Sequence, residues 1–210
     1  MKALMIVDLQ NDFMPGGALG VPDGDATVPV ANALAPIFPR VVATQDWHPR
    51  DHGSFASTHP DKVPGDIVEL GGVSQVLWPD HCVQGTPGAS FHSSLNVASI
   101  CRVIRKGADP GIDSYSAFFD NDRRSSTGLD LYLHAHGVLE LVIMGLATDY
   151  CVRASALDAI GLGFRVTVVA DGCRAVDVTP GDGERALAEM HTSGVKIVSS
   201  AELLDTTHGE

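Results

Sequence analysis

Short runs of apolar residues, many of them β-branched, alternate along the chain with stretches whose apolar positions recur at helical spacing. The apolar runs predict six strands, at residues 3–7, 41–44, 101–105, 139–144, 165–170 and 195–198. Because these runs are almost continuously apolar and do not alternate with polar residues, they are typical of parallel strands buried on both faces. We therefore expect a parallel sheet inside the molecule.

The helical stretches lie between these runs. They predict helices at residues 27–38, 126–136, 151–161 and 183–193, with a last helical turn near 201–204. Strands that alternate with helices in this way give an α/β fold, here a three-layer α/β/α sandwich with a mostly parallel, doubly wound sheet. In such folds ligands bind outside the carboxyl ends of the strands. Catalytic or ligand-binding residues are therefore expected directly after the strands.

Two long segments, 47–99 and 108–125, show neither pattern and are predicted to be irregular. Loops of this length inside a compact domain usually carry function. The first is rich in aromatic residues and histidines, which distinguishes it from a flexible linker. Since no repeat, low-complexity tract or domain boundary is visible, residues 1–210 are interpreted as a single domain.

The composition favours a protein that acts without a nucleic-acid or membrane partner. Of the 210 residues 44% are hydrophobic, and 26 acidic against 14 basic residues give a net charge of −12. Nucleic-acid phosphates need a basic face, which this charge disfavours. No apolar run approaches the ~20 residues of a membrane span. The four cysteines form no CxxC pair, which favours a reducing, cytoplasmic location.

Ionisable or metal-binding residues stand at the ends of four successive predicted strands. These are Asp8 at the first, Asp46 and His48 at the second, Lys106 at the third and Cys151 at the fourth. One polar residue at a strand end is common. Four successive strand ends of this kind are better explained by a functional site at one edge of the sheet.

Cys151 stands between an apolar run and a helical pattern, which places a thiol at a predicted helix N-terminus. Such a position lowers the pKa of a thiol and presents unpaired backbone N–H groups. One turn can then supply both a nucleophile and an oxyanion hole. A lone cysteine is more often a small buried apolar residue, but the polar strand ends around this one favour catalysis.

Asp46 and His48 also have the spacing of metal ligands. In an extended segment residues i and i+2 point to the same side, and Pro49 favours extended geometry at His48. One further histidine would complete a facial set for zinc, iron or manganese. The candidates in the same histidine-rich loop are His52, His59, His81 and His92.

Six segments carry motifs that are specific only in combination. They are 3–13 (ALMIVDLQNDF), 44–55 (TQDWHPRDHGSF), 77–89 (LWPDHCVQGTPGA), 104–107 (IRKG), 113–118 (DSYSAF) and 145–152 (GLATDYCV). Together they resemble the nicotinamidase/pyrazinamidase group of the isochorismatase-like cysteine hydrolases, essentially from end to end. The resemblance implies an enzyme with the isochorismatase-like fold that hydrolyses nicotinamide to nicotinate and ammonia, acts on pyrazinamide too and serves NAD salvage. It leaves open whether the protein is a homo-oligomer.

The resemblance also implies the roles of individual residues. Asp8, Lys106 and Cys151 match a catalytic triad, and the backbone N–H groups of Ala147 and Cys151 match an oxyanion hole. A cis peptide bond is expected at Leu146–Ala147. The implied mechanism has Lys106 and the helix N-terminus favour thiolate at Cys151, while Asp8 takes the thiol proton. The thiolate then attacks the carboxamide carbon, and water hydrolyses the resulting thioester.

One divalent metal ion (Zn, Fe or Mn) is implied on Asp46, His48 and His81, so that the loop region at about 46–99 becomes the metal-binding region. His52 matches a position that is a ligand in some members, and it is kept as a further candidate. The metal is expected to bind the pyridine nitrogen and to orient the substrate.

Phe13 and Trp78 are expected to sandwich the substrate ring. Three rival functions are weighed against this one. An isochorismatase usually lacks the thiol, and an N-carbamoyl amidase generally lacks the metal-ligand set. A zinc hydrolase whose metal activates water is disfavoured by the absence of HxE with PCxxC. A non-catalytic thiol or metal-binding protein would release no ammonia from nicotinamide.

Overall fold

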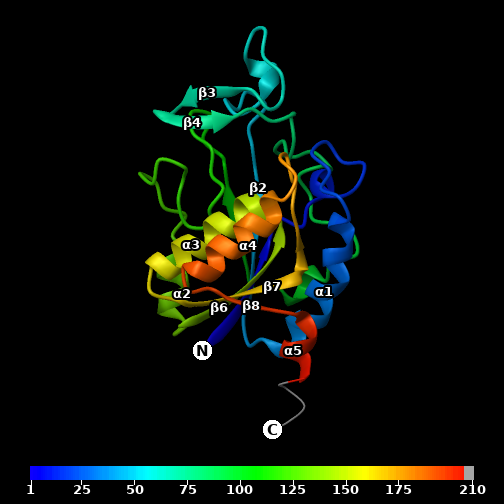
Figure 1. The fold of residues 1–210 in the computed structure, drawn as a ribbon, viewed down its shortest axis with the longest axis vertical. Coiled ribbons are helices and arrows are strands. Elements are labelled where there is room, and N and C mark those ends of the chain that lie inside the picture. The colour runs from blue at the N-terminus through cyan, green and yellow to red at the C-terminus, as the bar shows by residue number, and fades with distance from the viewer. Residues whose placement is uncertain (206–210) are drawn as a thin grey trace.

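A parallel six-stranded sheet forms the centre of the protein (Figure 1). The computed structural model describes residues 1–205, and the strands of this sheet are β1 Lys2–Val7, β2 Val41–Asp46, β5 Arg102–Lys106, β6 Glu140–Leu146, β7 Arg165–Arg174 and β8 Lys196–Val198. They lie in the order β5–β2–β1–β6–β7–β8, and every neighbouring pair is parallel. The six predicted strands are confirmed, although β7 continues to Arg174, past its predicted end at residue 170.

The central strands are buried on both faces, as their apolar runs predict. Every residue of β1 from Ala3 to Val7 is at most 1% exposed, and β6 is buried from Leu141 to Leu146. Burying a large apolar side chain contributes ~1.5–3 kcal/mol. The sheet is therefore a stable base for the residues at its edge.

Helices cover both faces of the sheet and complete the predicted three-layer sandwich (Figure 1). They are α1 Thr27–Leu34, α2 Leu129–Ala135, α3 Arg153–Gly161, α4 Asp182–Thr192 and α5 Ser200–Asp205. Helix α3 packs beside α4 on one face, and α1 packs beside α5 on the other. None of the helices within residues 1–205 is long and apolar enough to cross a bilayer.

Three helices are shorter than their periodicity predicts, and one of them is α3, which begins at Arg153 instead of residue 151. Helix α1 ends at Leu34 instead of residue 38, and Ala35–Ile37 continue as a 3₁₀ turn. Pro36 explains the change, because it has no backbone N–H and its ring clashes with the preceding helical turn. Helix α2 covers Leu129–Ala135 instead of 126–136, because Gly128 before it has a φ of 75°, outside the helical range.

The strand order reverses direction between β1 and β6. From β1 the chain adds β2 and β5 on one side, then crosses back to add β6, β7 and β8 on the other side. The connections that leave β1 and β6 therefore diverge to opposite sides and open a crevice at the carboxyl ends of these strands. This is where doubly wound sheets bind their ligands.

A two-stranded antiparallel sheet stands above this crevice (Figure 1). Its strands β3 Ile67–Leu70 and β4 Val73–Val76 lie inside the segment 47–99, so the prediction that this segment is irregular was wrong there. The strands were too short for their apolar pattern to stand out. Gly71 and Gly72, both with positive φ, form the two-residue turn that joins them, and a Gly-Gly pair between short runs is a hairpin signal.

Candidate active site

Four neighbouring strands bring their polar ends together at the crevice. Lys106 ends β5, Asp46 ends β2, Asp8 follows β1, and Cys151 lies in the turn after β6. The strands are adjacent in the order β5–β2–β1–β6, so these side chains converge although they are distant in sequence. All four are buried. We call Asp8, Lys106 and Cys151 the catalytic group.

Lys106 connects the members of this cluster. Its Nζ lies 3.0 Å from Asp8 Oδ2 and 3.3 Å from Cys151 Sγ. It also donates to Asp46 Oδ1 and, at 3.0 Å, to the carbonyl of Ser114. Burial opposes the charge on Lys106, but Asp46 and Asp8 outweigh burial and raise its pKa well above the ordinary value. Lys106 therefore remains a cation held between two carboxylates and a thiol.

Asp8 is held in one orientation by Thr44. The Thr44 hydroxyl donates to Asp8 Oδ1 at 2.6 Å and accepts from the Asp8 backbone N–H at 3.2 Å. The backbone of Asp8 has a φ of 49°, which turns the chain sharply out of β1. Burial, aided by the charge of Asp46 and opposed by Lys106, raises the pKa of Asp8 to about 6. At neutral pH this carboxylate is ionised but easily protonated, which suits a general base.

Cys151 lies in a π-helical turn, Thr148–Val152, and α3 begins only at Arg153. The predicted start of the α-helix at the cysteine was therefore wrong by two residues. The pKa of the thiol is raised well above its ordinary value, because burial and the two nearby carboxylates outweigh Lys106. The expectation that a place near a helix N-terminus lowers this pKa is corrected accordingly. The resting group is a thiol, and it needs a base to remove its proton.

The turn that carries Cys151 folds over the carbonyl of Ala147. The N–H groups of Tyr150 and Val152 donate to this oxygen at 3.2 and 3.1 Å. The expected cis peptide bond is present at Leu146–Ala147. Ala147 and Cys151, the two candidates for the oxyanion hole, both line the pocket described below.

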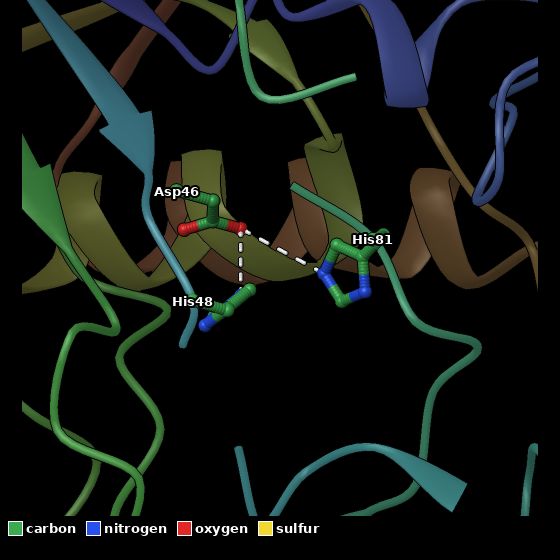
Figure 2. A group of neighbouring side chains, drawn as sticks. All are labelled: Asp46, His48 and His81. Atoms are coloured by element: carbon green, nitrogen blue, oxygen red, sulfur yellow. Dashed lines mark ion pairs between the residues drawn. The ribbon is translucent and has the colours of Figure 1, made fainter. Parts of the chain in front are cut away.

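Asp46, His48 and His81 gather their side chains beside the catalytic group (Figure 2). Nε2 of His48 and Nε2 of His81 lie 3.6 and 4.0 Å from the same atom, Asp46 Oδ2. Behind them, Nδ1 of His48 bonds the carbonyl of Gly107 at 2.7 Å and Nδ1 of His81 bonds that of Pro79 at 2.8 Å. A proton on each Nδ1 leaves each Nε2 lone pair free to bind a cation. We call these three residues the ligand group.

The ligand group fits a divalent transition metal. Its interatomic separations exceed a hydrogen bond and suit atoms that share one ion at bonds of ~2.0–2.2 Å. Burial, together with the charge of His48, lowers the pKa of His81 to about 4, so this imidazole is neutral and able to bind metal. Burial alone would raise the pKa of Asp46, but Lys106 and His48 hold it below its ordinary value. Two imidazoles and one carboxylate suit zinc, iron or manganese.

His52 lies next to the ligand group and is not one of its three members. Its imidazole is tilted by 46° against the ring of His48 at 4.4 Å, and its ligand atoms cluster with those of His48 and Asp113. Nδ1 of His52 bonds the hydroxyl of Ser54 at 2.7 Å. Nε2 of His52 is buried and has no hydrogen-bond partner within residues 1–205, and its assignment as a further ligand stays a prediction. Of the remaining candidates, His59 bonds the carbonyl of Gly53.

A pocket of about 400 Å³, measured to its open mouth, connects the two groups. Its walls are Phe13, Leu19, Asp46, Trp78, His81, Asp113, Tyr115, Ala147, Tyr150, Cys151 and Val176. Phe13 and Trp78 both line this pocket, and the sandwich of a substrate ring between them stays a prediction. The Phe13 ring lies 5.5 Å from that of His81, and the Trp78 ring lies edge-on to Tyr150 at 4.9 Å.

Several pocket residues were not singled out from the sequence. Tyr115 and Asp113 stand in the motif DSYSAF, which carried the resemblance but gave these residues no role. Tyr150 precedes the candidate nucleophile, and its position was a signal that we did not use. Leu19 and Val176 come from loops with no pattern of their own, and nothing in the sequence marks them.

The chain as a whole matches a known family. Residues 2–202 match the isochorismatase domain. The chain belongs to the isochorismatase family. A nicotinamidase of Escherichia coli is 50% identical over 98% of both chains. These findings confirm the resemblance drawn from the motifs and, with it, an amide-hydrolysing enzyme of the nicotinamidase group.

Solved structures agree with this placement. A nicotinamidase/pyrazinamidase structure from Acinetobacter baumanii has a TM-score of 0.93 and 47% identity, covering 96% of this chain and 97% of its own. A pyrazinamidase of Pyrococcus horikoshii, solved in complex with zinc, has a TM-score of 0.75 and 40% identity, covering 94% and 98%. The isochorismatase-like fold is thereby confirmed for this chain.

Proposed function

We propose that this isochorismatase-family protein is a cytoplasmic nicotinamidase of NAD salvage that hydrolyses nicotinamide to nicotinate and ammonia, and pyrazinamide likewise. One observation carries the mechanism: the Lys106 ammonium contacts Asp8, Asp46 and the sulfur of Cys151, and Cys151 lines the pocket. A base and a cation thus lie together beside a nucleophile that faces the pocket. The similarity to nicotinamidases supports the choice of substrate.

In the first step Asp8 removes the proton of the Cys151 thiol. The transfer is uphill, because the pKa of Asp8 is about 6 and that of the buried thiol is raised, and the Lys106 ammonium 3.3 Å from the sulfur offsets part of this cost. The sulfur electron pair forms a bond to the carboxamide carbon, and the C=O electrons move onto oxygen. The Lys106 ammonium stabilises the thiolate until the sulfur bonds to the carboxamide carbon. The N–H groups of Ala147 and Cys151 then hold the oxyanion, and one such donor contributes ~3–4 kcal/mol.

In the second step the oxyanion collapses and the C–N bond breaks. The proton on Asp8 passes to the departing nitrogen, so ammonia leaves and a thioester remains on Cys151. Asp8, again a carboxylate, removes a proton from water as the water oxygen attacks the thioester carbon. The C–S bond breaks, nicotinate is released, and the sulfur regains its proton from Asp8. No other proton donor is needed, because one carboxyl group serves both halves of the reaction.

The pocket walls position the ring. Phe13 and Trp78 would enclose its two faces. Asp46, His48 and His81 would hold one divalent metal ion, which supplies a Lewis-acid contact for the pyridine nitrogen when bound. The metal identity is not assigned. The Pyrococcus horikoshii relative was solved in complex with zinc, which supports a divalent metal ion in this protein.

The second candidate function is that of an N-carbamoyl amidase, which shares the cysteine and the fold. The ligand group disfavours it, because three buried metal-binding side chains would have no substrate atom to meet. Metal content and turnover of nicotinamide against an N-carbamoyl amino acid separate the two.

The direct test is ammonia release from nicotinamide by native protein, by Cys151→Ala and by the matched control Cys101→Ala, whose thiol is exposed and outside the pocket. Native protein and Cys101→Ala should be active. Cys151→Ala should lose turnover while its circular dichroism and metal content remain native. Activity in Cys151→Ala above a trace would contradict the thioester mechanism.

A further inference from the structure

Gln75 is a buried glutamine outside both the catalytic group and the ligand group. It lies on β4 of the hairpin and is 1% exposed. The two hydrogens of its Nε2 are shared among three acceptors, Asp113 Oδ2 at 3.1 Å, Tyr115 Oη at 3.0 Å and the carbonyl of Val76 at 2.7 Å. Its Oε1 accepts from Asn121 Nδ2 at 3.2 Å. Both ends of the amide are therefore used inside the protein.

The partners of Gln75 form one wall of the substrate pocket. Asp113, Tyr115 and Trp78 all line it, and Trp78 Nε1 donates to the same Tyr115 oxygen at 3.1 Å. Asn121 closes the network, because its Oδ1 accepts from the backbone N–H of Tyr115 at 3.0 Å. Gln75 thus connects the hairpin to the segment 113–121. Through Tyr115 it also fixes the Trp78 ring and the Tyr115 hydroxyl, two groups of residues that line the pocket.

The hydrogen bonds at Tyr115 leave its proton unused. A phenol oxygen that accepts from both Trp78 and Gln75 has both acceptor positions filled, and its own O–H remains to donate. Burial, reinforced by the charge of Asp113, raises the pKa of Tyr115, so the proton stays on the oxygen. Within residues 1–205 this O–H has no acceptor at hydrogen-bond distance. Because Tyr115 lines the pocket, a bound ligand can supply one.

We propose that Gln75 is a positioning residue for substrate binding, which holds Trp78 and Tyr115 as one wall and directs the Tyr115 hydroxyl proton to an acceptor on the bound pyridinecarboxamide. This inference rests on the proposed function, because it takes the ring to lie against Trp78. Gln75 acts through its partners. None of its hydrogen bonds reaches the catalytic group or the ligand group. Its loss should therefore weaken binding and leave the chemistry of Cys151 intact.

Two substitutions at Gln75 test the direction of these hydrogen bonds. Gln75→Leu removes the amide at similar volume. It should raise KM for nicotinamide by ~3-fold to ~12-fold, the value of one hydrogen bond, with kcat within about twofold. Gln75→Glu should raise KM further, because a carboxylate accepts the Tyr115 proton and stands beside the carboxylate of Asp113. Ser74→Ala, on the same strand but exposed, is the matched control and should leave KM unchanged.

Two readouts separate positioning from simple stabilisation. The rate of Cys151 alkylation by iodoacetamide should be native in every variant. Tyr115→Phe should raise KM as Gln75→Leu does, and the double variant should be no worse than either single one, because both act through one hydroxyl. If Gln75→Leu is too unstable to assay, Gln75→Glu and Tyr115→Phe decide by the same criteria.

The outcomes distinguish this inference from the function on which it rests. If native protein releases no ammonia from nicotinamide, the proposed function fails. If native protein is active but Gln75→Leu lowers only the melting temperature and leaves KM unchanged, the inference is overturned. Strictly additive effects of Gln75→Leu and Tyr115→Phe on KM would overturn it as well.

Discussion

Replacing Lys106 by alanine should slow the reaction of Cys151 with a small alkylating agent. The Lys106 ammonium lies 3.3 Å from the Cys151 sulfur, and both are buried. Without this cation, the thiolate that reacts with the reagent faces Asp8 and Asp46 alone. Both carboxylates already raise the pKa of the thiol, so less thiolate is present at any pH.

The magnitude follows from the distance. At an effective dielectric constant of ~20, unit charges 3.3 Å apart interact by ~5 kcal/mol. This is an upper limit, because water enters the space left by Lys106 and either carboxylate can take up a proton. We expect alkylation at pH 7 to slow by ~10-fold to ~100-fold, which corresponds to ~1.4–2.7 kcal/mol.

The assay is a time course of iodoacetamide labelling followed by intact mass, repeated across pH. Lys106→Arg keeps the charge and should alkylate more nearly at the native rate. Lys2→Ala, an exposed lysine at the start of β1, is the control for a lost positive charge. Breaking a buried ion pair costs ~3–5 kcal/mol of stability, so each variant must first be shown folded at the assay temperature. An alkylation profile in folded Lys106→Ala that matches the native profile would refute the role given to Lys106.

The other predictions concern the base, the metal and the ring. Because Asp8 must be ionised to take a proton and its pKa is raised to about 6, kcat/KM for nicotinamide should fall as pH decreases through about 6. A flat profile down to pH 5 would contradict this role. Asp8→Asn should lose ~10²–10⁴ in kcat with little change in metal content; near-native kcat would identify another base. His48→Ala and His81→Ala should lose bound metal, measured by elemental analysis, and nicotinamide turnover, whereas His52→Ala should keep its metal. Loss of metal in His52→Ala would bring that residue into the ligand group. Benzamide, which lacks the ring nitrogen, should be a poor substrate, since a site built to meet that nitrogen leaves its partner unpaired. Equal kcat/KM for benzamide and nicotinamide would show that the metal does not bind the ring.

Most of the sheet could be predicted because each strand is marked by its own short stretch of sequence. Buried parallel strands need continuous apolar runs, and those runs are visible in the sequence on either side of the polar strand ends. Asp8, Asp46, Lys106 and Cys151 stand at such ends, so their convergence follows from the fold class alone. Individual roles did not follow from spacing, and they came from the motifs. The interpretation of residues 1–210 as a single domain stays a prediction.

The features that the sequence did not predict depend on contacts between segments that are distant in the chain. The π-helical turn at Thr148–Val152 has no pattern of its own, since a short turn is fixed by what packs around it. The pKa of Cys151 could not be read from its place near a helix, because burial and carboxylates from two other strands decide it. Gln75 illustrates the same limit. Its partner Tyr115 lies 40 residues away, and only the folded hairpin brings the two side chains together.

The most direct test of the account is to trap the acyl-enzyme on Cys151. Native protein is mixed with excess nicotinamide, quenched with acid within the first turnovers, digested and analysed by mass spectrometry. The account predicts a nicotinoyl group on the peptide that contains Cys151, with none on the peptide that contains Cys101 and none when benzoate replaces the amide. An active enzyme that carries no acyl group at Cys151 at any quench time, or carries it on another residue, would contradict the thioester mechanism.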